Sequence, residues 1–260
     1  MKSIPMTRFD ISARLRAMGI HFLITLLVAA VAAALVFGLW FPPPFARMLG
    51  GLELFLLVVV CDLVLGPLIS LVLYNRTKPN SELLRDYLIV GLIQLAALLY
   101  GMHAVASTRP VFLVFAIDRL EVVSAGELDA DDLRKGTEAK WQQPAWTGPV
   151  LARAERPSDS QERSDLLFSA LAGKDIQHFP RYYREYGAAK ADILARAGAL
   201  PELQQRHPQA RAELDAAIAR SGLTESQLRW LPARHAKGFW TVLLDADSAL
   251  PVAWLELDPY

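Results

Sequence analysis

The sequence predicts a membrane α-helical domain of three transmembrane helices over residues 1–107, followed by a C-terminal α+β soluble domain with a small antiparallel sheet over residues 108–260. Two observations predict this fold class. Three long apolar runs fall within the first 107 residues, whereas charged residues are spread through the remainder. Strand-like segments lie at both ends of that second part, with helical patterns between them, which favours an α+β domain.

The three apolar runs have the length that a bilayer requires. A hydrocarbon core of about 30 Å needs roughly 20 apolar residues in a helix, and the runs cover about 19–40, 52–74 and 87–107. Three such runs in succession disfavour buried helices of a soluble protein. The first run is longer than the apolar region of a signal peptide and ends in Trp40 and a proline run, without a small-residue cleavage site. We therefore interpret it as a retained anchor.

The positive charges predict the orientation. The N-terminal tail holds four Lys or Arg residues and the second loop, 75–86, holds three, whereas the first loop, 41–51, holds only Arg47. Because positive residues are enriched on the cytoplasmic side, we expect a cytoplasmic N-terminus and a periplasmic soluble domain. The chain is then a multi-pass protein of the bacterial inner membrane. Trp40 and Phe41 are expected to form an aromatic anchor at the outer interface.

Asp62 is the most informative polar residue within the apolar runs. A carboxyl group at mid-bilayer costs about 2.5–3.5 kcal/mol on insertion scales, so such residues are functional candidates. It precedes Gly66 and Pro67, where the missing proline amide is expected to kink the helix. The third run offers Gln94 and Tyr100 as partners, and we expect Tyr100, at the better matching depth, to donate a hydrogen bond to Asp62. Such a pair would lock two helices together, bind a partner helix or relay protons.

Small residues recur at a spacing of four in two of the runs. They are Ala30, Ala34 and Gly38 in the first, and Ala97 and Gly101 in the third. Such faces let another helix approach closely. Packing within the domain and a groove for a foreign transmembrane helix are the two interpretations.

The soluble domain begins directly after the third run. Arg109 and Pro110 lead into strand-like residues 111–117 and 120–123, so we expect the domain to lie close to the membrane. Residues 141–149 read as a loop, and an aromatic cluster that includes Tyr182 and Tyr183 lies around 180–186. Helices are expected over 128–135, 158–172, 188–197 and 208–220, with a short one after Thr224, and a final hairpin over 239–244 and 252–257. The sheet is expected to join the first and last strands.

The sequence gives no positive reason to expect an enzyme. It contains no P-loop and no GxGxxG, GxSxG or HExxH motif. His178, His207 and His235 are scattered without ligand spacing and are expected to be surface or packing residues. The single cysteine, Cys61, excludes an intramolecular disulfide and Cys-based metal sites. We expect no cofactor or metal, and the net charge of −3 over residues 108–260 argues against binding nucleic acid.

Several stretches match a known family. They are residues 19–24 (GIHFLI), 40–44 (WFPPP), 62–68 (DLVLGPL), 94–101 (QLAALLYG), 109–112 (RPVF), 115–123, Leu231-Pro232 and 240–259. On these residues the sequence resembles the type IV pilin accessory proteins, the TfpX/TfpZ family of Gram-negative bacteria. The resemblance covers nearly the whole chain. It is strongest in the membrane half and loose over about 125–225.

The resemblance implies a non-enzymatic accessory factor, or chaperone, of type IV pilus biogenesis, which stabilises or presents a specific pilin. The implied partners are the transmembrane helix and globular head of a pilin subunit, membrane lipid and other pilus assembly proteins. We expect the client helix to meet the small-residue faces and Asp62–Pro67. Tyr182 and Tyr183 are expected to serve the client head, because tyrosines are common interface anchors.

Two alternatives of other classes stay open. One is a pilin-modifying membrane enzyme that uses Asp62 or Asp175, although such transferases usually have many more membrane spans and clustered catalytic polar residues. The other is a periplasmic sensor or a transporter subunit. A sensor needs a cytoplasmic output domain, and the expected cytoplasmic segments are short.

Overall fold

The computed structural model describes residues 11–75 and 78–260. The chain divides into two compact units. The helical unit holds the first helix up to Gly38 together with Leu52–Ala106, and the sheet unit holds Leu39–Gly51 together with Ser107–Tyr260. The first loop of the membrane part therefore folds with the sheet, so each unit is built from segments that are separated in sequence.

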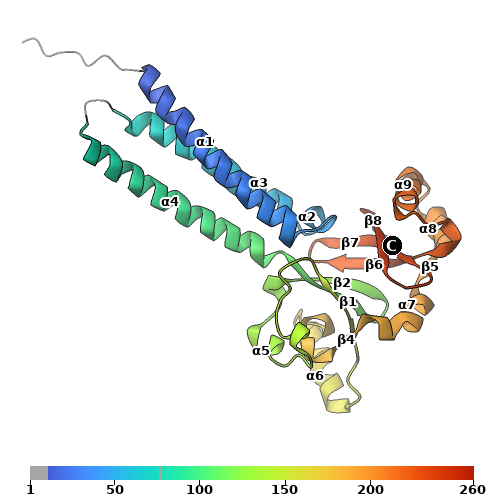
Figure 1. The fold of residues 1–260 in the computed structure, drawn as a ribbon. Coiled ribbons are helices and arrows are strands. Elements are labelled where there is room, and N and C mark those ends of the chain that lie inside the picture. Colours follow the sequence, from blue (N-terminus) through green and yellow to red (C-terminus); the bar gives the residue numbers. More distant parts are fainter. Residues whose placement is uncertain (1–10, 76–77) are drawn as a thin grey trace, which may run out of the picture. The chain divides into compact units, whose positions relative to one another are not determined.

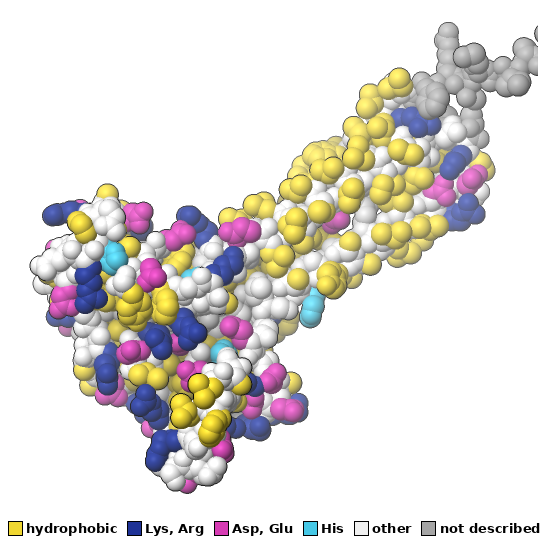
Figure 2. All heavy atoms as spheres, turned by 180° about the vertical axis from the view of Figure 1, so that it is seen from behind, with side chains coloured by type: hydrophobic (Ala, Val, Ile, Leu, Met, Phe, Trp, Pro, Cys, Tyr) yellow, Lys and Arg dark blue, Asp and Glu magenta, His cyan; other side chains and the backbone are white. Residues whose placement is uncertain are grey.

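Three long helices form the helical unit (Figure 1). Helix α1 (Ile11–Leu35) continues as a π-helix over Val36–Trp40, and α3 (Gly51–Leu73) and α4 (Asn80–Ser107) follow. All three are long and apolar enough to cross a membrane, which confirms the predicted three apolar helices. Figure 2 shows hydrophobic side chains covering the visible face of these helices, whereas charges are found at one end of the helices and on the sheet unit. α3 continues through Pro67 as one helical segment.

The sheet unit is built around an eight-stranded sheet in the order β4-β3-β1-β2-β6-β7-β8, with β5 paired to β6 (Figure 1). The strands are β1 (Pro110–Ala116), β2 (Arg119–Ser124), β3 (Val150–Ala154), β4 (Tyr183–Glu185), β5 (Gly198–Ala199), β6 (Leu228–His235), β7 (Gly238–Asp245) and β8 (Pro251–Leu255).

The prediction of an antiparallel sheet is wrong, because the sheet is mixed. β1 pairs with β3 and β2 pairs with β6 in parallel. Parallel neighbours need a long crossover connection, and the chain between β2 and β6 supplies one with its helices. The two terminal hairpins, β1–β2 and β7–β8, have the predicted antiparallel pairing, and the unpredicted β6 joins them.

Helices occupy the connections between the strands (Figure 1). The α-helices are α5 (Ala130–Leu133), α6 (Ser160–Leu171), α7 (Lys190–Arg196), α8 (Leu200–Arg206) and α9 (Arg211–Ser221), with short 3-10 turns that include η2 (Ala125–Glu127) and η4 (Ile176–His178). Four of the five lie within or near predicted segments. α8 was not predicted.

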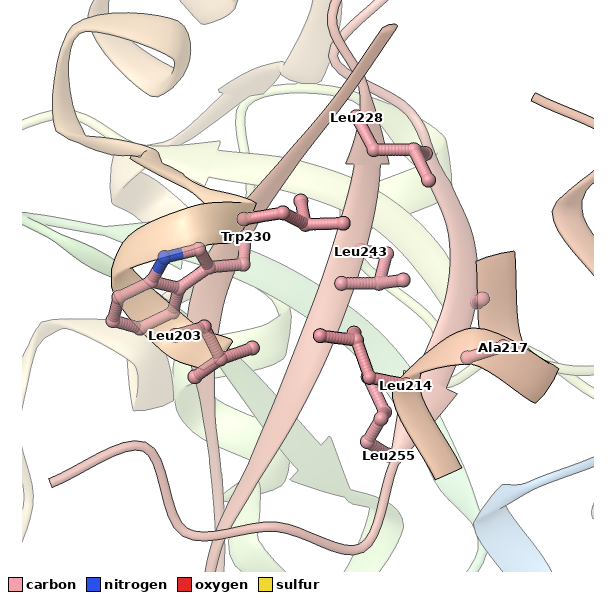
Figure 3. Close-up of a cluster of buried hydrophobic side chains, with 9 residues drawn as sticks. Leu203, Leu214, Ala217, Leu228, Trp230, Leu243 and Leu255 are labelled. Carbon is pink, nitrogen blue, oxygen red and sulfur yellow. The ribbon is translucent and has the colours of Figure 1, made fainter. Parts of the chain in front are cut away.

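Apolar clusters form the core of the sheet unit, two of them around Trp230 and around Phe112. In the first, Leu203 and Leu214 from α8 and α9 pack against Trp230 and Leu243 of the sheet (Figure 3). The Trp230 indole donates a hydrogen bond to the carbonyl of Ala199 (3.2 Å), which satisfies its one polar group. The second cluster is aromatic and holds Phe112, Trp141 and Tyr183, with ring centroids 5.2–6.0 Å apart.

The proline-rich first loop is part of this packing. Helix α2 (Phe45–Met48) places the Phe45 ring edge-on to Trp254 of β8, at 5.3 Å between centroids, and Arg47 forms a 3.1 Å ion pair with Glu256. The Phe41 side chain is 1% exposed, and Trp40 is also buried. The predicted aromatic anchor at the lipid interface is therefore wrong, because both side chains are enclosed by protein.

Candidate functional site

A polar network joins the three helices of the helical unit. His21 of α1 lies between Ser70 of α3 and Gln94 of α4, with 2.5 Å from Nδ1 to Ser70 Oγ and 2.9 Å from Nε2 to Gln94 Oε1. An amide oxygen only accepts, so Nε2 carries a proton and donates to Gln94. The imidazole thus contacts one residue on each of the other two helices and ties the three helices together.

Gly66 gives this network its room. A Cβ atom at this position would lie 2.3 Å from Gln94 Nε2 and 2.9 Å from His21 Nε2. Gly66 and Ser70 are four residues apart on α3 and therefore share one face. Gly66, together with Gln94, was singled out from the sequence, and the structure brings both to His21. The buried Pro67 follows directly.

The predicted hydrogen bond from Tyr100 to Asp62 is wrong. The Tyr100 side chain is 78% exposed. Asp62 is half-buried, and it forms no hydrogen bond within the described part of the chain. Matching depth alone ignored rotation about the helix axis. Tyr100 follows Gln94 by six residues, a turn of about 240°, so a helix that points Gln94 inward points Tyr100 outward.

The two small-residue faces differ: one packs within the helical unit, and the other is left open. Gly101 is buried against α3, and a Cβ atom there would lie 2.6 Å from a methyl carbon of Val58. This glycine therefore serves packing within the unit. Ala30 and Ala34 of α1 and Gly38 of the π-helix that continues it are exposed, and no other side chain lies within 4 Å of a Cβ placed on Gly38. That α1 face has no partner in the described chain.

Arg109 and Pro110 fasten the start of the sheet unit. Pro110 is buried as the first residue of β1, a strand position that tolerates proline. The Arg109 guanidinium donates to the carbonyl of Ala145 (3.4 Å) and lies over the Trp146 ring at 5.4 Å. The Arg109 carbonyl accepts a hydrogen bond from the backbone amide of Ala125. These contacts are structural.

Tyr182 and Tyr183 do not offer a surface to a partner. They are 5% and 0% exposed, and the Tyr183 hydroxyl donates to the backbone carbonyl of Gln177. Burial raises the pKa of Tyr183 far above its ordinary value, so the phenol stays neutral. The expectation that these residues anchor a client is corrected, because the core needs their rings.

Helix α6 carries the exposed apolar surface instead. None of its residues is buried, and Leu167, Phe168 and Leu171 are exposed, with Phe168 at 66%. Asp159 caps the helix by accepting the backbone amide of Glu162 at 2.9 Å. The signal was present in the sequence, because residues 166–171 read LLFSAL after a polar first half. No cluster of His, Cys, Asp and Glu that could hold a metal ion occurs among the described residues.

Comparisons with known proteins identify relatives of this chain. A family model described as fimbrial assembly protein FimB matches residues 9–50. Fimbrial assembly proteins of Dichelobacter nodosus serogroups I and E1 are 29% and 28% identical, each over 97% of this chain and 98% of the relative. A third, of serogroups C1 and C2, is 38% identical over 126 residues, which are 48% of this chain and 95% of that relative. The chain belongs to this family. No solved structure matches it.

The sequence motifs predicted a type IV pilus accessory protein, and the comparisons confirm that family. The segment that the family model matches includes His21 of the polar network and the Trp40–Pro44 stretch of the first loop. It ends at Gly50, just before α3 begins. The matched segment thus contributes to both compact units of this fimbrial assembly protein.

Proposed function

We propose that this chain is a non-enzymatic accessory factor, or chaperone, of type IV pilus biogenesis in the bacterial inner membrane, and that it stabilises or presents a specific pilin subunit. The names of its relatives support a part in fimbrial assembly. The observation that carries the finer proposal is the pair of unpartnered surfaces, one on each unit. A client that is itself a transmembrane helix with a globular head would cover both.

The α1 face suits a helix. In lipid, helices associate through close van der Waals packing, which small residues at a spacing of four permit. Ala30, Ala34 and Gly38 have this spacing, and the space over Gly38 is open. Asp62 is half-buried and unbonded within the described chain, so it remains available to a polar group that a partner brings into the bilayer.

The α6 face suits a folded head. Large exposed apolar patches on a soluble domain mark interaction sites, and Leu167, Phe168 and Leu171 form such a patch on one helix. A hollow of about 220 Å³ lies beside it, between the exposed Ile117 and α6, with Arg156 and Arg163 on its wall. This surface takes the part that the sequence analysis gave to Tyr182 and Tyr183.

Site-specific photo-crosslinking in native membranes tests the proposal. A photoreactive residue at Ala34 or Phe168 should capture pilin. Matched controls are Leu92 of α4 and Leu250 of the β7–β8 loop, which are also exposed and apolar and lie outside both surfaces. Capture at the controls alone, or at none of the four positions, contradicts the proposal. Deletion of the protein should lower the level of pilin and the number of surface pili.

The proposed orientation, with a cytoplasmic N-terminus and a periplasmic sheet unit, has its own test. The chain holds one cysteine, so Cys61→Ser gives a background without thiols. In that background Ser158→Cys, before α6, should react with a membrane-impermeant maleimide in cells with a permeabilised outer membrane. Ser81→Cys, at the start of α4, should react only after the inner membrane is opened. The reverse pattern refutes the orientation.

The absence of catalysis is also part of the proposal. Asp62→Asn and Asp175→Asn should leave the covalent mass of pilin unchanged, because the proposed action is binding alone. Mass spectrometry of pilin from these strains measures this. A modification of pilin that either variant abolishes would favour the enzyme alternative.

A further inference from the structure

Two adjoining hollows lie on the sheet unit, next to helix α6. The smaller, of about 220 Å³, is mainly apolar and lies among Ile117, α6 and Ile176. The larger, of about 480 Å³, is mainly polar and is bounded by β3 and α7. Ile117 and Arg156 belong to the walls of both hollows. One bound segment can therefore enter both of them at once.

Ile117, at the boundary of the two hollows, has a backbone conformation that isoleucine disfavours. It lies in the turn between β1 and β2 with φ at 65°, and the Asp118 amide donates to the Ala116 carbonyl at 2.7 Å. Tight hairpin turns usually place glycine at a positive φ, and a β-branched residue there is an outlier. The side chain is 41% exposed, so the core does not require it. Strained residues cluster at binding sites, which favours a contact with a partner.

Three exposed arginines in the walls have no carboxylate partner. Arg156, Arg163 and Arg196 form no ion pair with any residue that the structure describes, and Arg163 donates only to backbone carbonyls. Arg153 in the same wall, by contrast, donates to Glu155 at 2.7 Å. The soluble part of the chain is acidic as a whole. The two hollows are therefore a local basic site that no carboxylate within ion-pair distance balances.

The carboxylates of the two walls are engaged elsewhere. Glu155 accepts from Arg153, and Asp192 lies 3.8 Å from the same guanidinium. Asp175 accepts the backbone amide of Ile176 at 2.7 Å. A carboxylate that a ligand brings to the unpaired arginines would therefore displace no existing ion pair. Charge-assisted hydrogen bonds of arginine with carboxylates are among the stronger polar contacts in proteins.

We propose that the two hollows bind an acidic polypeptide segment of a partner, in which one large apolar residue has carboxylates beside it. The apolar side chain enters the smaller hollow against Ile117 and Leu167. The neighbouring carboxylates form ion pairs with Arg156 and Arg196. The exposed apolar face of α6 extends the contact. This site rests on the proposed function, because it lies on the α6 surface that meets the client head.

Other occupants fit less well. The apolar hollow of about 220 Å³ is smaller than the pockets of about 300–1,000 Å³ that hold small molecules, so it suits one side chain. A basic segment would meet three arginines. A second copy of this chain, docked face to face, would bring the same arginines against themselves. An anionic membrane offers both chemistries, but it is flat on this scale, whereas a side chain fills a hollow.

Fluorescence anisotropy with the full-length protein in nanodiscs of phosphatidylcholine tests the proposal. The first probe is a labelled, blocked peptide with a central phenylalanine between pairs of aspartates. Two related probes have asparagines in place of the aspartates, or alanine in place of the phenylalanine. We expect the first peptide to bind at least tenfold more tightly than either relative. Raising the salt concentration from about 0.1 M to about 1 M should remove its advantage over the asparagine peptide, because salt screens exposed ion pairs.

Variants locate the contact, with thermal unfolding used to confirm that each one folds. The double variant Arg156→Gln and Arg196→Gln should lose the preference for aspartate but keep that for phenylalanine, and Leu167→Gln should do the reverse. Ile117→Gly should weaken the first peptide at least threefold and yet unfold at no lower temperature, because glycine adopts a positive φ without strain. Arg220→Gln on the exposed side of α9 is the matched control and should bind like the unaltered protein.

Several outcomes overturn the inference. They are equal binding of the three peptides, no binding by any of them, and unchanged preferences in the folded variants. Flotation of the nanodiscs with phosphatidylglycerol vesicles, lost in the double arginine variant, would assign the surface to a membrane and also overturn it. The two proposals fail separately. Capture of pilin at Phe168 without any preference among the peptides contradicts this inference alone, whereas the preferences without capture contradict only the proposed function.

Discussion

Gly101→Ala is the sharpest test of how the helical unit packs. The added Cβ would lie 2.6 and 2.7 Å from the two methyl carbons of Val58, whereas ordinary contact begins at 3.4 Å. Valine is held in one rotamer in a helix, so its methyl groups cannot rotate away. The shortfall of about 0.7–0.8 Å must therefore be met by moving α3 and α4 apart.

The expected magnitude comes from a difference between two glycines of the same helix. Overpacking by one methyl group costs about 1–3 kcal/mol. Any glycine-to-alanine change also stabilises a helix by up to about 1 kcal/mol in water, and Gly91→Ala measures that gain alone, because nothing lies within 4 Å of its Cβ. Gly101→Ala should therefore be about 1–3 kcal/mol less stable than Gly91→Ala.

The assay unfolds the purified chain in mixed micelles with rising sodium dodecyl sulfate. Limited proteolysis of α4 measures the fraction of the chain that is unfolded. Val58→Ala removes both clashing methyl groups and should restore most of the loss in a Gly101→Ala background, as a double-mutant cycle would show. Equal stability of the two glycine variants refutes the packing argument. Failure of Val58→Ala to rescue refutes the assignment of the clash to that side chain.

Three further outcomes are expected. Gln94→Leu removes the hydrogen bond to His21 and should lower the unfolding free energy in micelles by about 0.6–1.7 kcal/mol. Phe41→Ala should cost about 3–5 kcal/mol in chemical unfolding, because the ring is fully enclosed, whereas Phe168→Ala at the exposed α6 surface should stay within about 0.5 kcal/mol. Burial raises the pKa of Glu121 above 4.5, with Arg234 and Arg119 partly offsetting it. A raised pKa means that the folded state favours the neutral carboxyl, so this group's contribution to stability is present below pH 4.5 and is lost as the pH rises through the folded pKa. The unfolding free energy of Glu121→Gln should therefore not show this decrease as the pH rises from 4.5 through the folded pKa of Glu121.

Local patterns were enough to predict most of the elements. The apolar runs found α1, α3 and α4, and the alternation and turn residues found the hairpins β1–β2 and β7–β8. The central strand β6 was not predicted, because Pro232 and its three Arg and His side chains read as irregular sequence. A proline argues against a central strand, and it is the tertiary pairing with β2, β5 and β7 that makes Leu228–His235 extended.

The sequence predicted some of the residues of the candidate site, but it did not predict which of them are in contact. Gly66 and Gln94 were named from the sequence, whereas His21, at the centre of their network, was included only within the family-like stretch 19–24. Depth along a helix can be counted from the sequence, but the side of the helix that faces a neighbour depends on packing. For that reason Tyr100 was preferred over Gln94, although Gln94 is the residue that points inward.

In both units, the residues that hold the fold together can be distinguished from the residues on exposed surfaces. Stretches that resemble the family most strongly build the frame: they supply His21, Gly66 and Gln94 of the network and the Phe41 core of the first loop. The loosely resembling stretch, about 125–225, holds the exposed α6 face. A frame must keep its packing in every member, because interiors tolerate little change in volume. A surface that meets a client needs only to match its own client. Loose resemblance at these positions is therefore what the proposed function, a factor devoted to one client, would require.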